Sequence, residues 1–196
     1  MSLALGFNGS HVLDMFIQTE PTPNPATLKF LPGQAVMPSG TANFPTPDAA
    51  ARSPLATRLF AIDGVTGVFL GSDFVTVTKA PALEWHVLKP PILGALMEHL
   101  SANLPVIAET AGAAKAEGGN SALVDQIKEL LDTRVRPRVA EDGGDIVFHD
   151  FRDGVVYLHM QGSCSGCPSS TATLKMGIEN LLKHYVPEVT RVEAVA

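Results

Sequence analysis

Both cysteines of the chain lie two residues apart, in the stretch Gly162-Ser163-Cys164-Ser165-Gly166-Cys167-Pro168-Ser169-Ser170. Cysteines this close together cannot form a disulfide that stabilises a domain, so we expect the protein to work in a reducing compartment. Pro168 suits the first position of a helix, and the apolar residues after it recur at helical spacing until Pro187. The pair is therefore expected at a loop-to-helix junction, where backbone N–H groups and the helix dipole lower the pKa of a thiol.

Three uses of such a pair are possible: a disulfide redox couple, half of a zinc site, or half of an iron–sulfur site. Structural zinc and cubane clusters usually take four ligands, so two cysteines predict a homodimer bridged by the metal. A redox pair predicts a monomer, and the thioredoxin-like version usually carries an aromatic residue before the first cysteine, where this chain has Gly162 and Ser163. The residues favour a metal site, with a redox pair and an inert pair as alternatives.

Composition narrows the classes of partner. The 196 residues are 45% hydrophobic, which is typical of a globular protein, and 20 acidic against 14 basic residues give a net charge of −6. This charge argues against a nucleic-acid or anionic-membrane partner, and no apolar run approaches the length of a membrane span. Residues 1–14 resemble no export or organelle signal and are expected to be a loose extension. We therefore expect a cytoplasmic protein, or one of the mitochondrial matrix if it is an organelle homologue without its transit peptide.

The first half of the chain predicts a small α+β domain. The predicted elements are strands over 16–19 and 26–31, a helix over 55–62, a hairpin of strands over 65–70 and 74–78, and a helix over 83–100 interrupted at Pro90-Pro91. A long proline-containing loop over 32–54 is expected to be an insertion or a lid over the sheet. Trp85, His86 and His99 are interpreted as structural or solvated residues rather than ligands.

The second half predicts another small α+β domain after a change of composition. Residues 108–120 are small and polar and are interpreted as a flexible linker. Ser121 is a candidate N-cap for a helix that Pro137 should kink or end. A turn over 141–145, a hairpin of strands over 146–151 and 155–160, the cysteine loop with its helix, and a strand over 189–195 give the order α-β-β-α-β. We expect the acidic residues of the turn to be solvated rather than to bind a hard metal.

These residues resemble a known family. The run Glu141-Asp142-Gly143-Gly144-Asp145-Ile146, followed by the cysteine stretch, is similar to the NifU-like C-terminal domain of Nfu iron–sulfur carriers. Gln18-Thr19-Glu20-Pro21-Thr22-Pro23-Asn24-Pro25 and Leu28-Lys29-Phe30 resemble the opening of the Nfu N-terminal domain, and the stretch 85–91 resembles its later helix. The resemblance divides the chain into an extension over 1–14, an N-terminal domain over 15–107, a linker over 108–120 and a C-terminal domain over 121–196.

The resemblance implies a scaffold or carrier without enzymatic activity. It implies that Cys164 and Cys167 bind a 4Fe-4S cluster shared between two subunits, and that the cluster passes to apo-proteins after delivery by upstream assembly proteins. Two helix N-termini would stabilise the anionic cluster, and two ligands per subunit offer a route to its release. The main rival is a thiol–disulfide oxidoreductase with Cys164 as nucleophile and Cys167 as resolving thiol, and a structural zinc dimer comes third.

Overall fold

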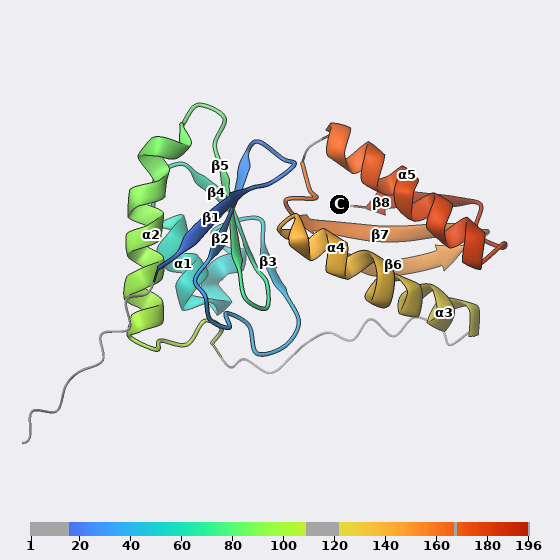
Figure 1. The fold of residues 1–196 in the computed structure, drawn as a ribbon, viewed down its shortest axis with the longest axis horizontal. Helices are drawn as coiled ribbons and strands as arrows, with labels where there is room; N and C mark the ends of the chain where they lie inside the picture. The colour runs from blue at the N-terminus through green and yellow to red at the C-terminus, as the bar shows by residue number, and fades with distance from the viewer. Residues whose placement is uncertain (1–15, 109–121, 167, 196) are drawn as a thin grey trace, which may run out of the picture.

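The computed structural model describes residues 16–108, 122–166 and 168–195, and it forms two α+β units with separate hydrophobic cores (Figure 1). The predicted fold class is therefore confirmed. Ser121, nearly all of the expected linker and the expected N-terminal extension lie outside the described residues. Among the described helices, none is long and apolar enough to cross a membrane.

The first unit is built on a fully antiparallel five-stranded sheet in the order β1-β2-β5-β4-β3. Its strands are β1 (Gln18–Pro21), β2 (Thr27–Leu31), β3 (Ala42–Phe44), β4 (Val65–Leu70) and β5 (Val75–Lys79). Alternate residues of the neighbouring strands β2 and β5, such as Leu28 and Val77, point into the core on one face of the sheet. The side chains between them face the opposite way and are nevertheless buried, as Lys29 and Thr76 are.

Two helices cover the apolar face of this sheet, α1 (Pro54–Phe60) and α2 (Trp85–Ser101) (Figure 1). Ser53 caps α1 by accepting a hydrogen bond from the Ala56 N–H. Pro54 follows at the first helical position, where its missing N–H costs no hydrogen bond. The predicted interruption of α2 at Pro90-Pro91 is wrong, because the helix runs through both prolines. Leu88 and Ile92 on either side are buried in the same core, and this packing holds the two halves in line despite the missing N–H groups.

The proline-containing loop over 32–54 is more structured than the sequence predicted. It contains edge strand β3 and a short 3-10 helix, Ala49–Arg52. Phe44 on β3 is completely buried in the first core, so this segment is part of the sheet rather than a cover laid over it. A three-residue strand between prolines leaves too short an alternating pattern to be predicted.

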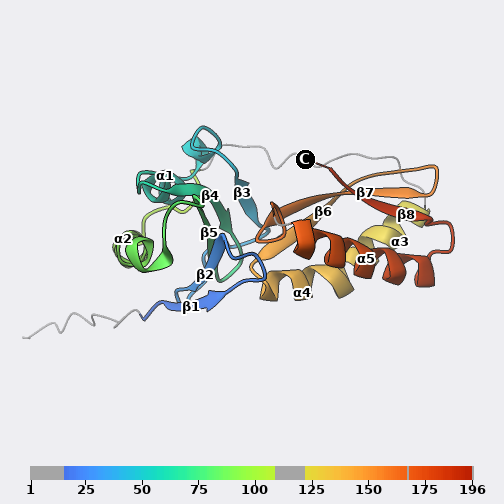
Figure 2. The ribbon, with the colours of Figure 1, turned by 90° about the horizontal axis from the view of Figure 1, so that it is seen from above.

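The second unit is a three-stranded sheet covered by helices on one face (Figure 2). Its strands are β6 (Gly144–Arg152), β7 (Val155–Gly162) and β8 (Arg191–Val195), and its helices are α3 (Ala122–Leu130), α4 (Arg136–Glu141) and α5 (Pro168–Tyr185). Strands β6 and β7 form the predicted hairpin, in which Asp153 and Gly154 both adopt positive φ angles, and β8 pairs with β7 in parallel. A π-helical turn, Leu131–Val135, separates α3 from α4, and Pro137 falls in the first turn of α4 as the predicted kink requires.

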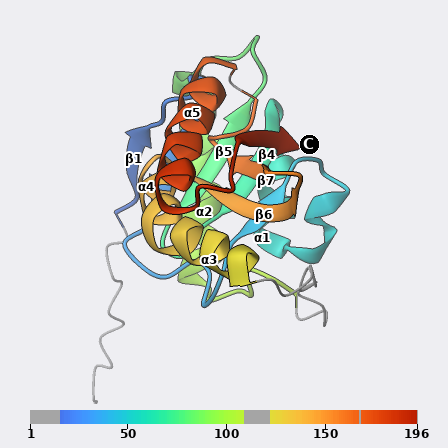
Figure 3. The same cartoon turned by 90° about the vertical axis from the view of Figure 1, so that its right-hand side faces the viewer.

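The two units lie against each other. Viewed along the long axis of the molecule, β6, β7 and α5 stand in front of the sheet of the first unit (Figure 3). Among the described residues, four hydrogen bonds between side chains of the first unit and groups of the second join them. The second unit therefore covers the face of the first sheet that α1 and α2 leave open.

Candidate functional site

Strand β7 delivers the chain directly into the cysteine loop. Gly162 ends the strand with a φ of 62°, and Gly166 adopts a φ of 81° before α5 begins. Both values lie in the left-handed region, which glycine adopts without strain. Within the loop, the Cys164 N–H donates to the Gln161 carbonyl at 3.3 Å, and the Thr171 hydroxyl of α5 donates to the Cys164 carbonyl at 3.1 Å. The strand end and the helix start thus hold the backbone of Cys164 from both sides.

The sulfur of Cys164 sits against Gly144, the first residue of β6. Cys164 is 6% exposed, and a Cβ placed on Gly144 would lie 2.5 Å from its sulfur. No carbon atom that is not bonded to the sulfur approaches it that closely, so glycine at this position makes the room that the sulfur occupies. Gly144 is therefore required by the site, whereas Gly143, with a φ of 80°, is required by the turn.

Burial raises the pKa of the Cys164 thiol to about 11, with Asp142 and Asp145 adding to the effect and a hydrogen bond with Ser163 opposing it. The predicted lowering of this pKa by the helix N-terminus is therefore wrong for Cys164. The sulfur packs within the core of the second unit, and α5 begins only at Pro168, so desolvation outweighs the dipole. A neutral, buried thiol is a poor nucleophile.

A cavity of about 470 Å³ opens beside Cys164. Its lining combines the cysteine loop, β7 and β8 with two residues of the first unit, Asn43 and Pro45. His159 on β7 also lines it, and the rings of His159 and His149 meet edge to face. The space next to the thiol is therefore shared by both units.

Cys167 lies outside the described residues, so the predicted pairing of Cys164 with Cys167 as ligands stays a prediction. Within the described ranges, no group of three or more His, Cys, Asp or Glu side chains could hold a metal ion.

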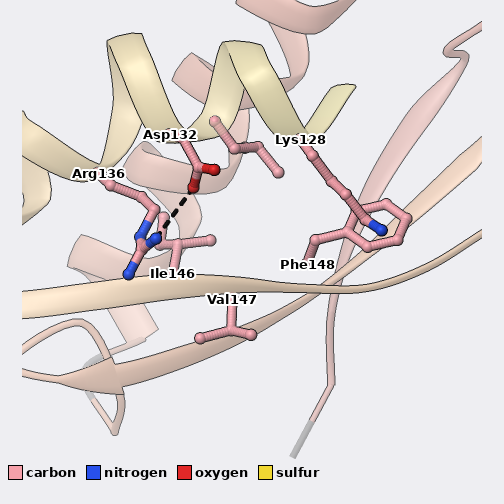
Figure 4. A pocket seen from close by; sticks show the side chains of 7 residues that line it. Lys128, Asp132, Arg136, Ile146, Val147 and Phe148 are labelled. Carbon is pink, nitrogen blue, oxygen red and sulfur yellow. Dashed lines mark hydrogen bonds and ion pairs between the residues drawn. The ribbon is translucent and has the colours of Figure 1, made fainter. Parts of the chain in front are cut away.

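The acidic turn differs from the sequence-based interpretation. Asp145 is 3% exposed, and Arg136 donates to both of its carboxylate oxygens at 2.8 Å. The Thr41 hydroxyl of the first unit donates to Oδ2 of the same carboxylate at 2.7 Å. Figure 4 shows Arg136 reaching from α4 toward β6 beside Ile146, with a dashed line marking its ion pair with Asp132. Asp145 is thus a buried structural anion, and the prediction of a solvated turn is wrong for it.

The isolated ligand candidates of the first half take structural or solvated positions. His99 is buried in α2 with its Nε2 atom 3.2 Å from the Pro105 carbonyl, and burial lowers its pKa. The Trp85 indole N–H donates to the Pro25 carbonyl at 3.3 Å, whereas His86 is exposed. None of these residues lines the cavity beside Cys164.

Sequence reasoning missed the residues of the first unit whose side chains donate hydrogen bonds to the cysteine loop or to the turn before β6, among them Asn24, Lys29, Thr41 and Thr76. A signal was present in β2 and β5, where polar residues alternate with Leu28, Phe30, Val75 and Val77. This alternation predicts a second face for the sheet but gives no indication of what covers that face.

Comparison with known proteins matches each of the two units to a known domain family. The family model described as scaffold protein Nfu/NifU N terminal matches residues 17–103, and the NifU-like domain model matches residues 127–193. A human protein named "NFU1 iron-sulfur cluster scaffold homolog, mitochondrial" is 53% identical over 184 residues, which cover 92% of this chain and 72% of that protein. "NifU-like protein 4, mitochondrial" of Arabidopsis thaliana is 51% identical over 193 residues, which cover 95% of this chain and 68% of that protein.

The solution structure of a NifU-like protein from Saccharomyces cerevisiae covers 54% of this chain and all of its own, with 27% identity and a TM-score of 0.45. Both halves of the chain match family models in the same order as the two units, and more than half of the residues aligned with the human relative are identical. The chain therefore belongs to the Nfu family, in which an Nfu N-terminal domain precedes a NifU-like domain.

Proposed function

We propose that this chain is an iron–sulfur cluster carrier without enzymatic activity. Two chains would bind one 4Fe-4S cluster through Cys164 and Cys167 of each and transfer it to apo-proteins. The human relative's name describes a scaffold for iron–sulfur clusters, which supports the general role. The cluster type, the dimer and the transfer are our extension of that role.

The observation that carries this proposal is the placement of Cys164. Its sulfur lies in a space kept open by Gly144, at the wall of a cavity of about 470 Å³ and next to the start of a helix. Because the described residues offer no further cluster of ligands, a second copy of the chain is the simplest source of the remaining thiolates. Cluster binding would replace the thiol proton, as metal binding to cysteine generally does.

The alternative hypothesis, that the chain is a thiol–disulfide oxidoreductase, has less support. An attacking thiol in such an enzyme is usually accessible and ionised, whereas Cys164 is packed among Ile146, Leu158 and the rest of the second core. A structural zinc dimer uses the same four thiolates and is distinguished by metal analysis.

The proposed partners follow from the carrier role. Upstream assembly proteins would load the chain, and apo iron–sulfur proteins would receive the cluster. We propose a reducing compartment, because the thiols must stay free to bind iron. The two relatives compared above carry mitochondrial names, and the choice between cytoplasm and mitochondrial matrix for this chain stays a prediction.

The decisive experiment measures iron, acid-labile sulfide and mass in solution on one anaerobically reconstituted sample. We expect about two irons and two sulfides per chain in a dimer. Cys164→Ser and Cys167→Ser should each lose both the iron and the dimer, whereas Ser165→Ala, in the same loop, should keep them. Zinc in place of iron supports the zinc dimer. A metal-free monomer in which Cys167→Ser traps a mixed disulfide would contradict the proposal in favour of the redox enzyme.

A further inference from the structure

Four residues stand side by side across the first sheet, on the face that meets the second unit. Lys29 on β2 pairs with Thr76 on β5, Thr76 pairs with Phe69 on β4, and Phe69 pairs with Asn43 on β3. Residues directly opposite each other on neighbouring strands point to the same face. We call Lys29, Thr76, Phe69 and Asn43 the docking row.

Two members of the docking row hold the turn that precedes β6. The Lys29 ammonium donates to the Glu141 carbonyl at 3.0 Å, and the Thr76 hydroxyl donates to the Gly143 carbonyl at 2.7 Å. Thr76 is fully buried and Lys29 is 7% exposed. Buried polar groups of this kind are costly unless they are paired, so these contacts belong to a closely packed interface.

The other two members reach the cysteine loop and its cavity. A Cβ on Gly162, the residue two before Cys164, would lie 3.0 Å from the Phe69 ring, so the ring packs directly on this glycine. Asn43 lines the cavity beside Cys164 together with Pro45. The docking row therefore runs from the acidic turn to the wall of the proposed cluster site.

Two residues outside the docking row complete the contact. The Asn24 side-chain amide donates to the Ser165 carbonyl at 3.0 Å, immediately after Cys164 in the chain. On the other side of Cys164, the Ser163 N–H donates to the same Gly143 carbonyl that Thr76 binds. The first unit thus holds the loop on both sides of the cysteine, directly at Ser165 and through Gly143 at Ser163.

We propose that the N-terminal domain is a structural part of the cluster site: its docking row positions the loop of Cys164, and its segment 43–45 forms one wall of the cavity that receives the cluster. The inference rests on the proposed function for the identity of the cargo. It gives the proline-containing loop over 32–54 a role, because this loop contributes Asn43 and Pro45. In this arrangement Lys29 and Thr76 act through the backbone of the turn at 141–143, whose Gly143 carbonyl also binds Ser163, and are positioning residues.

The first test follows the thiol itself and needs no cluster. In the full-length, metal-free Cys167→Ser chain, we would measure the rate of Cys164 alkylation by iodoacetamide. Thr76→Val keeps the shape of the side chain and removes its hydrogen bond, which should raise the population of the open loop and the alkylation rate by about fivefold. Thr76→Ser should restore the slow rate.

Thr78→Val is the matched control, since Thr78 lies two residues along the same strand and faces the same way. None of the hydrogen bonds found between the described parts of the two units uses the Thr78 side chain. A thermal unfolding scan of each variant shows whether it is folded. If Thr76→Val and Thr78→Val react equally, the docking row does not position the loop and the proposal is overturned.

The second test uses the chain with both cysteines, reconstituted with iron and sulfide. Loss of the visible absorption on addition of a ferrous chelator should be about fivefold faster in Thr76→Val than in Thr78→Val. Faster alkylation with unchanged cluster loss would also overturn the proposal, because the N-terminal domain would then merely shield the thiol. If the parent chain takes up no cluster, the proposed function has failed, and with it the assignment of the cavity to a cluster, while alkylation still decides whether the domain positions the loop.

Discussion

Thr76 and Ser163 donate hydrogen bonds to one and the same oxygen, the carbonyl of Gly143, at 2.7 and 3.2 Å. Thr76 belongs to the central strand of the first sheet, and Ser163 immediately precedes Cys164. This carbonyl thus links the N-terminal domain to the cysteine loop, in addition to the direct hydrogen bond from Asn24 to Ser165. Changes in this region are therefore expected to alter both the stability of the chain and the reactivity of the thiol.

Replacing Gly144 with alanine should damage the site directly. The new Cβ would lie 2.5 Å from the Cys164 sulfur and 2.7 Å from the Gln161 carbonyl oxygen, so the loop must shift. We expect a loss of about 1–3 kcal/mol in the free energy of unfolding and a large fall in iron bound per chain. Chemical denaturation and iron analysis check both effects.

Gly94→Ala is the control for that change. Gly94 lies in α2, and a Cβ there would meet nothing within 4 Å. Alanine should stabilise the helix by about 0.5–1 kcal/mol and leave iron binding unchanged. Equal iron loading in Gly144→Ala and Gly94→Ala would show that the Cys164 sulfur does not need the space at Gly144.

Asp145→Asn should be strongly destabilising. The substitution weakens the paired hydrogen bonds from Arg136 and leaves a guanidinium without its main counter-ion, in a region where Asp145 is buried. Because Arg136 is partly exposed, we expect a loss of about 2–3 kcal/mol rather than the full cost of breaking a buried pair. Urea denaturation measures the difference.

Asp132→Asn provides the comparison, since Asp132 binds the same arginine from the surface of the helix. Its effect should be a few tenths of a kcal/mol, as for other exposed ion pairs one helical turn apart. Similar losses for the two substitutions would contradict the view that Asp145 is the anion that anchors Arg136.

Alkylation of Cys164 should depend on pH over an unusually alkaline range. With a pKa of about 11, the thiol in the Cys167→Ser chain is almost entirely protonated at neutral pH. The rate should therefore rise by about tenfold for each pH unit between 8 and 10. In urea, where the thiol is hydrated, the profile should level off near pH 9. A plateau below pH 8 in the folded chain would contradict the burial of the thiolate site.

His99 should make the chain less stable in mild acid. Burial lowers the pKa of His99 in the folded state below its ordinary value of 6.5. The unfolded chain therefore binds the proton more readily, and stability falls as pH drops below about 6.5. In urea titrations at pH 7.5 and pH 5, wild type should lose more stability than His99→Gln. His86→Gln, which changes an exposed residue, should lose as much stability as wild type does. If His99→Gln also lost as much stability between pH 7.5 and pH 5 as wild type, His99 would not be the cause of the acid sensitivity.

The sequence predicted the elements whose pattern is long and uninterrupted. The helix after the cysteines and both hairpins were correct because periodicity and turn residues agreed there. Strand β3 was missed because three residues between prolines carry no readable period. The continuity of α2 through Pro90 and Pro91 was missed because tertiary packing, rather than local preference, decides it.

The sequence predicted only those parts of the candidate site that are formed by residues close together in the chain. Two cysteines at this spacing stand out in any reading of the sequence, whereas the burial of Cys164 depends on Gly144, twenty residues earlier. Asp145 resembled an ordinary turn residue because its partners Arg136 and Thr41 come from other segments. The contribution of the N-terminal domain depends on how two units dock, and no pattern within either unit encodes that docking.

The parallel pairing of β8 with β7 has a practical consequence for labelling. Ala194 and Val195 line the same cavity as Cys164, so a reporter or affinity tag fused after β8 would emerge beside the thiol. A fluorescent or purification tag is better attached before β1, whose neighbour in the sheet is β2 and which does not line this cavity.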